Sequence, residues 1–501
     1  MDGSRDTVGF LKVITFFSKE PRQSTSNSVV DEMITVSGHL TPFFAKVASC
    51  KTKPESLSLN HDSKFDTANQ IHSPKLPNTI HPIYAKHIIK VGREPDICDI
   101  VISHATISLV HCLLWSIAFD SETPAIVYLK DVSKNGVYIN GVLVGKGNTS
   151  MIQSNDIIEI TKAIKMIYIS IVNSDRLLRQ RIQHWDITEN VIGSGSYGSV
   201  YVAYKNNNPK CYAVKIIKER MKPDFNFGHT EKLRNEVEIL MKTDHPNIIK
   251  LHDAFIIRDT LYMFEDLVCG GDLFSYLVQG TSLRPIGETE TILIVFQLLK
   301  VLDYLHNDLN VVHRDLKLDN VLLLAPVPCT KIYLCDFGIA KCLKSPNLRA
   351  STLVGTVEYS APEIFGTTSC SELPKHSSMI LETNSFKTIS SEVQDLNMGY
   401  DYKCDMWSLG IMIHIMLSGI SPFYCDGNNI NIIKTAGQGI LNLDRPAFAG
   451  VSISAKNFIT GLIRVNPENR FMAKDCFRQT WITRNRENLD RIYKEKILGF
   501  N

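Results

Sequence analysis

The sequence predicts a multidomain protein in which an all-β sandwich is followed by a larger α+β domain. Its 501 residues are enough for two or three domains. From His87 to Val172, short β-rich runs alternate with turn residues, which is typical of a sandwich. After Trp185 the pattern changes to a glycine-rich turn, further strands and longer helical segments. These two patterns place a domain boundary between residues 172 and 185.

The composition argues against several classes of protein. Lys+Arg 54 and Asp+Glu 52 nearly balance, so neither nucleic acid nor a membrane is expected as a direct partner. The 12 cysteines contain no C-x-x-C pair, which argues against a zinc cluster or a disulfide framework and favours a reducing compartment. The first twenty residues lack the long apolar run of a signal peptide. We therefore expect a soluble protein inside the cell.

The boundaries of the predicted regions follow shifts in composition. Residues 1–30 are polar and Ser-rich and are predicted to be disordered. The sandwich domain is placed at 31–172, with its core at 87–172, a candidate first strand at Met33–Val36 and a long loop at 50–80. A charged connector at 173–184, predicted to be helical, leads to the second domain at 185–482. That domain is predicted to carry a disordered Ser/Thr-rich insert at 366–398, and a charged helix is predicted at 483–501.

The turns of the predicted sandwich carry an ordered set of residues: Gly92-Arg93, Ser108, His111, Asn135-Gly136 and Asn140-Gly141. Each of them alone is an ordinary turn residue. Together, and in this order, they resemble the forkhead-associated (FHA) domain, a sandwich that binds phosphothreonine.

This resemblance implies a phosphothreonine-containing protein as partner. Arg93 and Ser108 are expected to contact the phosphate and Asn135 to hold the peptide backbone, while His111 and Asn140 brace the loops. The chemistry is consistent, because a phosphothreonine is a dianion that charged donors on loops can bind. Two neighbouring positions depart from the usual FHA residues, so the side-chain preference beyond the phosphate stays open.

Three motifs in the second domain point to phosphate chemistry when they are taken together. They are the loop HRDLKLDN at 313–320, the glycine-rich turn IGSGSYGSV at 192–200 followed by Ala213-Val214-Lys215, and DFG at 336–338. A lone G-x-G-x-x-G is weak evidence, because dinucleotide-binding folds share it. The combination resembles a protein kinase, which implies a bilobal α+β domain, ATP as phosphate donor and Mg²⁺ as metal.

The kinase resemblance assigns a role to each charged residue of the central loop. Asp315 is expected to accept the substrate hydroxyl proton, and Lys317 to neutralise the transferred phosphoryl group. Asn320 and Asp336 are expected to hold magnesium. Thr356 resembles the threonine that hydrogen-bonds the catalytic aspartate.

Nucleotide contacts are expected from several segments before this loop. Lys215 should contact the α- and β-phosphates, held there by Glu236 on a predicted helix, with Glu238 as a weaker alternative. By similarity, backbone groups of Asp266 and Val268 bind adenine. The full set of predicted cofactor-binding residues is Ile192, Gly193, Gly195, Gly198, Val200, Lys215, Asp266, Val268 and Asp272.

Four further positions carry expectations about specificity and control. Glu265 falls at the gatekeeper position, where a buried carboxylate is costly unless it is hydrogen-bonded. Asp272 and Asp319 stand where basophilic relatives bind arginine, which predicts an arginine about three residues before the target. Ile339, directly after DFG, goes in the wider family with threonine over serine as the target.

The segment between DFG and Ala361-Pro362-Glu363 predicts a switch. Thr352 stands where relatives carry an activating phosphothreonine. Arg314, beside Asp315, is the cation that such a phosphate pairs with in similar kinases. We expect Thr352 phosphorylation to activate the enzyme.

The order of an FHA domain before a kinase domain resembles the checkpoint effector serine/threonine kinases, and FEDLVCGGDLFSYL at 264–277 is most similar to their meiosis-specific yeast branch. The resemblance implies a chromosome-associated nuclear protein that docks on a phosphorylated chromosome-axis component and is activated by dimerisation or clustering. Its implied role is to sustain the meiotic recombination checkpoint and suppress repair between sisters. Two alternatives stay open: a mitotic damage-checkpoint kinase, and a phosphopeptide-binding scaffold with an inactive kinase lobe.

Overall fold

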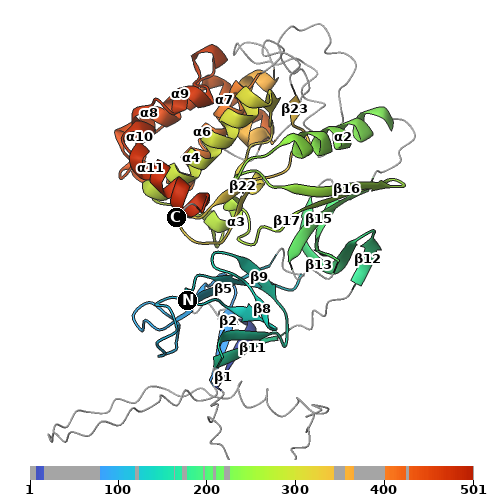
Figure 1. Cartoon of the computed structure of the whole chain (residues 1–501). Coiled ribbons are helices and arrows are strands. Elements are labelled where there is room, and N and C mark those ends of the chain that lie inside the picture. The colour runs from blue at the N-terminus through green and yellow to red at the C-terminus, as the bar shows by residue number, and fades with distance from the viewer. Residues whose placement is uncertain are drawn as a thin grey trace, which may run out of the picture.

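The computed structural model describes residues 7–15, 79–118, 123–162, 164–171, 178–195, 198–206, 210–218, 226–342, 356–365, 401–424 and 428–499. A β-sandwich lies against a larger two-lobed domain (Figure 1). None of the helices in this part of the chain has the length and apolar character that crossing a bilayer requires.

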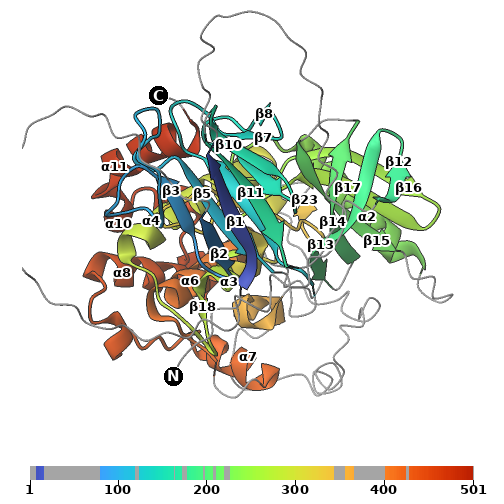
Figure 2. The same cartoon turned by 90° about the horizontal axis from the view of Figure 1, so that it is seen from below.

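The sandwich consists of two sheets with strand orders β2-β1-β11-β10-β7-β8 and β4-β3-β5-β6-β9. Apolar residues alternate along the strands, so that Leu11 and Val13 from the first sheet meet Leu114 and Leu129 from the second in one buried core. Figure 2 looks along the sandwich toward the helices of the second domain. The strands are β1 (Thr7–Thr15), β2 (Ile80–Tyr84), β3 (Ile89–Gly92), β4 (Ile100–Val101), β5 (Cys112–Ile117), β6 (Ile126–Asp131), β7 (Tyr138–Ile139), β8 (Val142–Leu143), β9 (Thr149–Ile152), β10 (Ile157–Thr161) and β11 (Ile164–Ser170).

The first strand corrects the prediction that residues 1–30 are disordered. Residues 7–15 form β1, which pairs antiparallel with both β11 and β2. The reason is the alternation of Leu11 and Val13, whose side chains are fully buried in the sandwich core. Polar and Ser-rich flanks concealed this short period-2 pattern. The domain therefore begins near residue 7, not at 31, and the candidate strand Met33–Val36 and most of the loop 50–80 lie outside the described residues.

The connector was also predicted wrongly as a helix. Leu178–Ile182 form strand β12, which pairs with the start of β13 (Trp185–Gly195). Ile182 is buried beside Trp185 in the core of the following sheet. A ready strand partner and a buried anchor outweigh the weak helical preference of a charged segment.

The small lobe of the second domain is a sheet with the order β12-β13-β14-β15-β17-β16 and one long helix, α2. Trp185 stacks on Phe264 at 4.3 Å between ring centroids and centres the sheet's aromatic core. The elements are β14 (Gly198–Lys205), β15 (Cys211–Lys218), α2 (Asn226–Lys242), β16 (Leu251–Ile257) and β17 (Thr260–Asp266).

The large lobe is mainly helical and is organised around α4 and α6, which are buried along nearly their whole length. Short antiparallel strand pairs flank the loops of this lobe. The helices are α3 (Leu273–Leu277), α4 (Glu288–Asp303), α6 (Lys403–Ser418), α7 (Asn429–Gln438), α8 (Ile453–Leu462), α9 (Ala473–Cys476), α10 (Thr480–Thr483) and α11 (Arg486–Ile492). The strands are β18 (Val278–Gln279), β19 (Ser282–Leu283), β20 (Val311–Val312), β21 (Val321–Leu323), β22 (Ile332–Leu334) and β23 (Lys341–Cys342).

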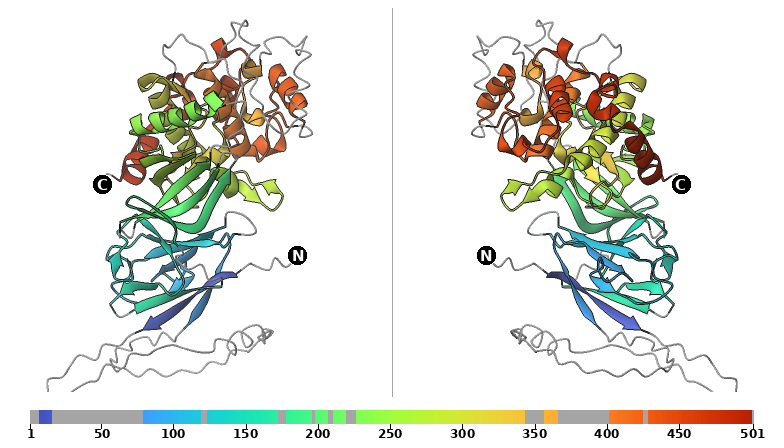
Figure 3. Two further views of the ribbon diagram at one scale, coloured as in Figure 1. Left: turned by 90° about the vertical axis from the view of Figure 1, so that its right-hand side faces the viewer. Right: turned by 90° about the vertical axis from the view of Figure 1, so that its left-hand side faces the viewer.

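The two lobes meet at the segment after β17, which we call the hinge (residues 267–271). The strands of the sandwich adjoin the strands of the small lobe in both views of Figure 3. In the large lobe, α11 and the π-helical turn Tyr493–Ile497 form the predicted charged C-terminal helix.

Candidate functional sites

An ion-pair network joins three elements at the junction of the lobes. Lys215 on β15 donates to Glu236 Oε1 of α2 at 2.8 Å and to Asp336 Oδ1 at 3.1 Å. Burial alone would lower the pKa of Lys215, but the carboxylates of Glu236 and Asp336 raise it above its ordinary value. Burial likewise opposes ionisation of Asp336, yet Lys215 holds its pKa below the usual range. Lys215 and Asp336 therefore each favour the charged form of the other.

The loop 313–320 brings a second set of charges to the same cleft. Asp315 Oδ1 accepts hydrogen bonds from the Thr356 hydroxyl at 3.0 Å and from the Thr356 N–H at 3.2 Å. Lys317 Nζ lies 2.8 Å from Asp315 Oδ2 and donates to the Thr356 hydroxyl at 3.1 Å. Asn320 Nδ2 donates to the Asp315 carbonyl at 2.7 Å. A carboxylate, an ammonium group and a hydroxyl thus converge on one point.

Asp405, which the sequence argument did not single out, holds this loop in place. It is fully buried at the start of α6, and its two oxygens accept the backbone N–H groups of His313 at 2.9 Å and Arg314 at 2.8 Å. His306 Nε2 lies 2.8 Å from the same carboxylate. Burial opposes its ionisation, but His306 keeps its pKa below the ordinary value. The signal was available, because Asp405 opens the helix motif Asp-Met-Trp-Ser-Leu-Gly.

A cavity of about 1120 Å³ opens between the lobes beside these charges. Apolar side chains from both lobes form part of its wall, which suits a flat aromatic ring. At Gly198 an added Cβ would lie 2.1 Å from the Ile216 carbonyl oxygen, so only glycine fits there. The predicted residues that line the cavity are Ile192, Gly193, Gly198, Val200, Lys215, Asp266, Val268, Asp272, Asp315, Lys317, Asn320 and Asp336. Among the residues whose side chains the structure describes, Glu236 and Thr356 do not line it.

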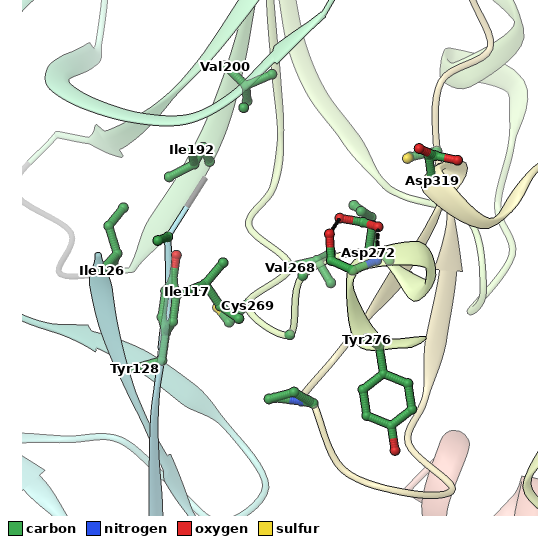
Figure 4. A pocket seen from close by; sticks show the side chains of 18 of the residues that line it. Ile117, Ile126, Tyr128, Ile192, Val200, Val268, Cys269, Asp272, Tyr276 and Asp319 are labelled. Carbon is green, nitrogen blue, oxygen red and sulfur yellow. Dashed lines mark hydrogen bonds between the residues drawn. The ribbon is translucent and has the colours of Figure 1, made fainter. Parts of the chain in front are cut away.

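Asp272 and Asp319 are two acidic residues that line the cavity (Figure 4). The carboxylate of Asp272 accepts from the Ser275 N–H and hydroxyl, both at 2.7 Å, and so caps the N-terminus of α3. Burial, and then the charge of Asp272, raises the pKa of Asp319. The two carboxylates are therefore near enough for the charge of Asp272 to act on Asp319.

Glu265 sits on β17 opposite Ala213 of β15, at the back of the cavity. Burial raises its pKa to about 7, although the positive charge of Lys215 opposes this shift. The neighbouring Asp266 differs, because its side chain is paired with His252 at 2.9 Å and Lys210 at 3.1 Å on the outer side.

The predicted magnesium ligands suit that ion. Asn320 and Asp336 offer an amide and a carboxylate oxygen, and both line the cavity beside Lys215. Mg²⁺ in phosphoryl-transfer sites is held by one or two such groups together with phosphate oxygens. Within the described residues no cluster of three or more His, Cys, Asp or Glu side chains forms a metal site, so an all-protein cage is absent there.

The loops of the sandwich bring the other predicted set together. The Arg93 N–H donates to the Ser108 carbonyl at 3.1 Å, and the Lys134 N–H donates to the Ser108 hydroxyl at 3.1 Å. Asn135 Nδ2 donates to the Thr106 carbonyl at 2.6 Å. The Arg93 and Asn135 residues are exposed. They therefore form an open surface with donors that a phosphopeptide could reach.

Buried side chains brace these loops. His111 is fully buried, its Nδ1 accepts the Ser108 N–H at 3.2 Å, and its Nε2 lies 3.4 Å from the Gly136 carbonyl. Asn140, in a left-handed conformation with φ 50°, bonds Asp156 Oδ1 at 2.7 Å and the Ile157 N–H at 2.9 Å. Both contacts are of the bracing kind expected for these residues.

The phosphorylation candidate Thr352 and the insert 366–398 lie outside the described residues. The neighbouring Arg314, with φ 70°, donates through Nε to the Ile339 carbonyl. Burial, and then the charge of Arg314, lowers the pKa of Lys341. Arg314 therefore lies near enough to Lys341 for its charge to act on it, and Lys341 precedes the segment that contains Thr352 in the sequence.

Comparison with known proteins agrees with this arrangement. The protein kinase domain family matches residues 187–482, and the FHA domain family matches residues 89–161. The chain belongs to the protein kinase family, and it is a serine/threonine kinase that carries an FHA domain. A kinase domain implies ATP and Mg²⁺ as cofactors, and an FHA domain implies binding of phosphothreonine peptides.

Several individual proteins are similar to this chain. The chain is 39% identical to the meiosis-specific serine/threonine-protein kinase MEK1 of Saccharomyces cerevisiae, over 84% of this chain and 85% of that protein. It is 32% identical to meiosis-specific mek1 of Schizosaccharomyces pombe, over 85% and 88%. The crystal structure of Rad53 residues 1–466 with AMP-PNP aligns with a TM-score of 0.47 and 21% identity, covering 94% of this chain and all of that one.

Proposed function

We propose that this kinase acts in meiosis, transferring the γ-phosphate of ATP to threonine or serine in proteins to which its FHA domain recruits it. The observation that carries the catalytic part is the convergence of Lys215, Asp315 and Asp336 on one cavity with their charges already paired. The similarity to two meiosis-specific kinases supports the biological part.

Each charged residue of the cleft would have a separate role in phosphoryl transfer. Asp315, held by Asp405 through the loop backbone and by Thr356, would orient the substrate hydroxyl and accept its proton. Lys317, 2.8 Å from Asp315, would stay beside the oxygen atoms that gain negative charge. Lys215 would bind the α- and β-phosphates while Glu236 fixes its position. Bound Mg²⁺, held by Asn320 and Asp336, supplies charge neutralisation for the phosphates.

Substrate preference is proposed from the paired carboxylates. Asp272 and Asp319 both line the cavity and influence each other's charge, so an arginine side chain between them would be stabilised. We expect an arginine about three residues before the target. Ile339 supports threonine as the preferred target by family resemblance alone.

Control is proposed to pass through the FHA domain. A phosphorylated chromosome-axis protein in the nucleus would bind through Arg93, Ser108 and Asn135 and raise the local kinase concentration. Phosphorylation of Thr352 by a neighbouring copy would then place an anion near Arg314 and Lys341. A mitotic damage-checkpoint role is the alternative, and expression timing separates the two.

The decisive experiment is a phosphotransfer assay with Mg-ATP and an arginine-containing peptide, comparing the full chain with Asp315→Ala. The wild type should transfer phosphate and the variant should lose at least about a thousandfold in rate. Equal background rates in the two proteins would favour the scaffold with an inactive kinase lobe. The exposed Glu189→Gln serves as control and should transfer phosphate like the wild type.

A further inference from the structure

The second sheet of the FHA sandwich is apolar on both faces. Along β5, Cys112 and Leu114 point into the sandwich core, whereas Leu113, Trp115 and Ile117 belong to a different buried cluster. Antiparallel sheets usually keep one face polar and wet. A second apolar face of this kind indicates that something covers it.

The outward side chains form one continuous row. Trp115 of β5 is paired with Tyr128 of β6, which is paired with Met151 of β9. Ile117 and Ile126 form the adjacent pair in the same sheet. Trp115 is 1% exposed, Tyr128 3% and Met151 6%. We call these five residues the hinge-facing row.

Three parts of the kinase domain cover this row: the small lobe, the hinge and the large lobe. Val202, Ile192 and Tyr204 reach it from the small lobe, Leu267 and Cys269 from the hinge, and Ala325 and Val327 from the large lobe. The contact is directional as well as apolar, because Trp115 Nε1 donates to the Cys269 carbonyl at 2.8 Å in a buried position.

The contact adjoins the nucleotide cavity. Cys269 directly follows Val268, the expected adenine neighbour, and Ile192 closes the cavity from the small lobe. Trp115, Ile117, Ile126 and Tyr128 line the same cavity, and the side chains of the last three stand on the far side of the hinge from Asp272 in Figure 4. One wall of the cavity is therefore supplied by the FHA domain.

We propose that Trp115 is a positioning residue for nucleotide binding: the hinge-facing row joins the two lobes across the hinge and holds the cavity in the closed, charge-paired arrangement. Rotation of the lobes pivots at the hinge. A rigid sheet that contacts both lobes and bonds the hinge backbone opposes that rotation. The described structure fits this role, since Lys215 is paired with Glu236 while the row is in contact. The inference rests on the kinase activity and is independent of the meiotic role.

The test is the affinity of the full chain for Mg-ATP, measured by calorimetry, in Trp115→Ala and Trp115→Phe. We expect roughly tenfold weaker binding in Trp115→Ala, which loses both the ring and the donor. Trp115→Phe keeps an aromatic ring but loses the donor, and should weaken binding roughly threefold. In steady-state assays the loss should appear in KM for ATP more than in kcat.

Controls separate positioning from folding. Phosphothreonine-peptide affinity should stay within about twofold of the wild type in both variants, since Arg93 and Ser108 lie in other loops of the domain. Ile80→Ala, at an exposed position on the other sheet, should leave ATP affinity unchanged. Val327→Arg, which introduces charge from the kinase side, should weaken ATP binding without altering the FHA sheet.

Unchanged ATP affinity in Trp115→Ala with intact peptide binding would overturn the proposal, as would tighter ATP binding, which would make the row an inhibitory lid. If Trp115→Ala loses peptide binding and so fails to fold, Trp115→Phe and Val327→Arg decide. Wild-type ATP affinity in both would then refute the positioning role.

Discussion

The kinase cleft and the FHA loops are both proposed to bind phosphate, yet their charged side chains are arranged in opposite ways. In the cleft, Lys215 is paired with Glu236 and Asp336, and Lys317 is paired with Asp315. On the FHA surface, Arg93 is exposed, and among the described residues no carboxylate lies within ion-pair distance of it. The cations of the cleft therefore have partners within the protein, whereas Arg93 has none among the described residues.

The difference follows from burial and from the task. A buried lysine without a counterion would lose its charge, so the cleft needs internal partners that also fix geometry for chemistry. An exposed arginine is solvated and needs none. Mutations in the cleft should therefore disturb both rate and stability, while those in the FHA loops should alter affinity alone.

The largest expected effect is at Lys215. Lys215→Met removes the cation that neutralises Glu236 and Asp336, so phosphotransfer should fall by at least about a thousandfold. The unfolding temperature should also fall, because the buried carboxylate of Glu236 and the partly exposed carboxylate of Asp336 are left without their shared cation. Lys215→Arg is the matched control that keeps the charge; since its planar fork differs from an ammonium group, it should recover stability but little activity. Normal activity in Lys215→Met would contradict the assignment.

A smaller effect is expected at Arg93. Arg93→Ala removes a charged donor from the phosphate, so phosphothreonine-peptide affinity should weaken about a hundredfold. Fluorescence anisotropy with a labelled peptide measures this. KM for ATP and the unfolding temperature should stay as in the wild type, because the side chain is exposed. A lower unfolding temperature in Arg93→Ala would contradict the contrast between the two sites. It would mean that the Arg93 side chain stabilises the fold.

Motifs with fixed spacing made the catalytic residues predictable. HRDLKLDN, AVK and DFG each place polar residues on short loops, and the structure brings Lys215, Asp315 and Asp336 to one cavity as expected. Glu363, of the Ala361-Pro362-Glu363 motif, is paired with Arg470, with an Nη1 to Oε1 distance of 2.6 Å. The residues of each motif are adjacent in the sequence, so the motifs could be identified without knowledge of the tertiary structure.

Features that depend on distant partners were not predictable in the same way. Strand β1 is identified by its pairing with β11, which lies some 150 residues later in the chain, and β12 by its pairing with β13. Strand β5 is one of the β-rich runs that predict the sandwich, but only the fold shows that its outer face meets the hinge. Asp405 likewise acts on a loop 90 residues earlier. Long-range contacts of this kind leave only a weak local trace.

The smallest effect, at Glu265, tests how far the cleft tolerates an extra charge. Burial raises the pKa of Glu265 from 4.5 to about 7. Between these values the folded protein retains a proton that the unfolded chain releases, so wild-type stability should decline as pH rises from about 4.5 to 7 and then level off.

Glu265→Gln cannot ionise, so it should be more stable than the wild type above about pH 7, by an amount on the order of 1–3 kcal/mol, and equal to it near pH 4.5. Calorimetric unfolding temperatures across this pH range measure the difference, with the exposed Glu189→Gln as a control that shows none. A stability gain that is the same at every pH would mean that Glu265 does not titrate in this window. A loss of stability at high pH would mean that its charge, beside Lys215, contributes to the paired network of the cleft.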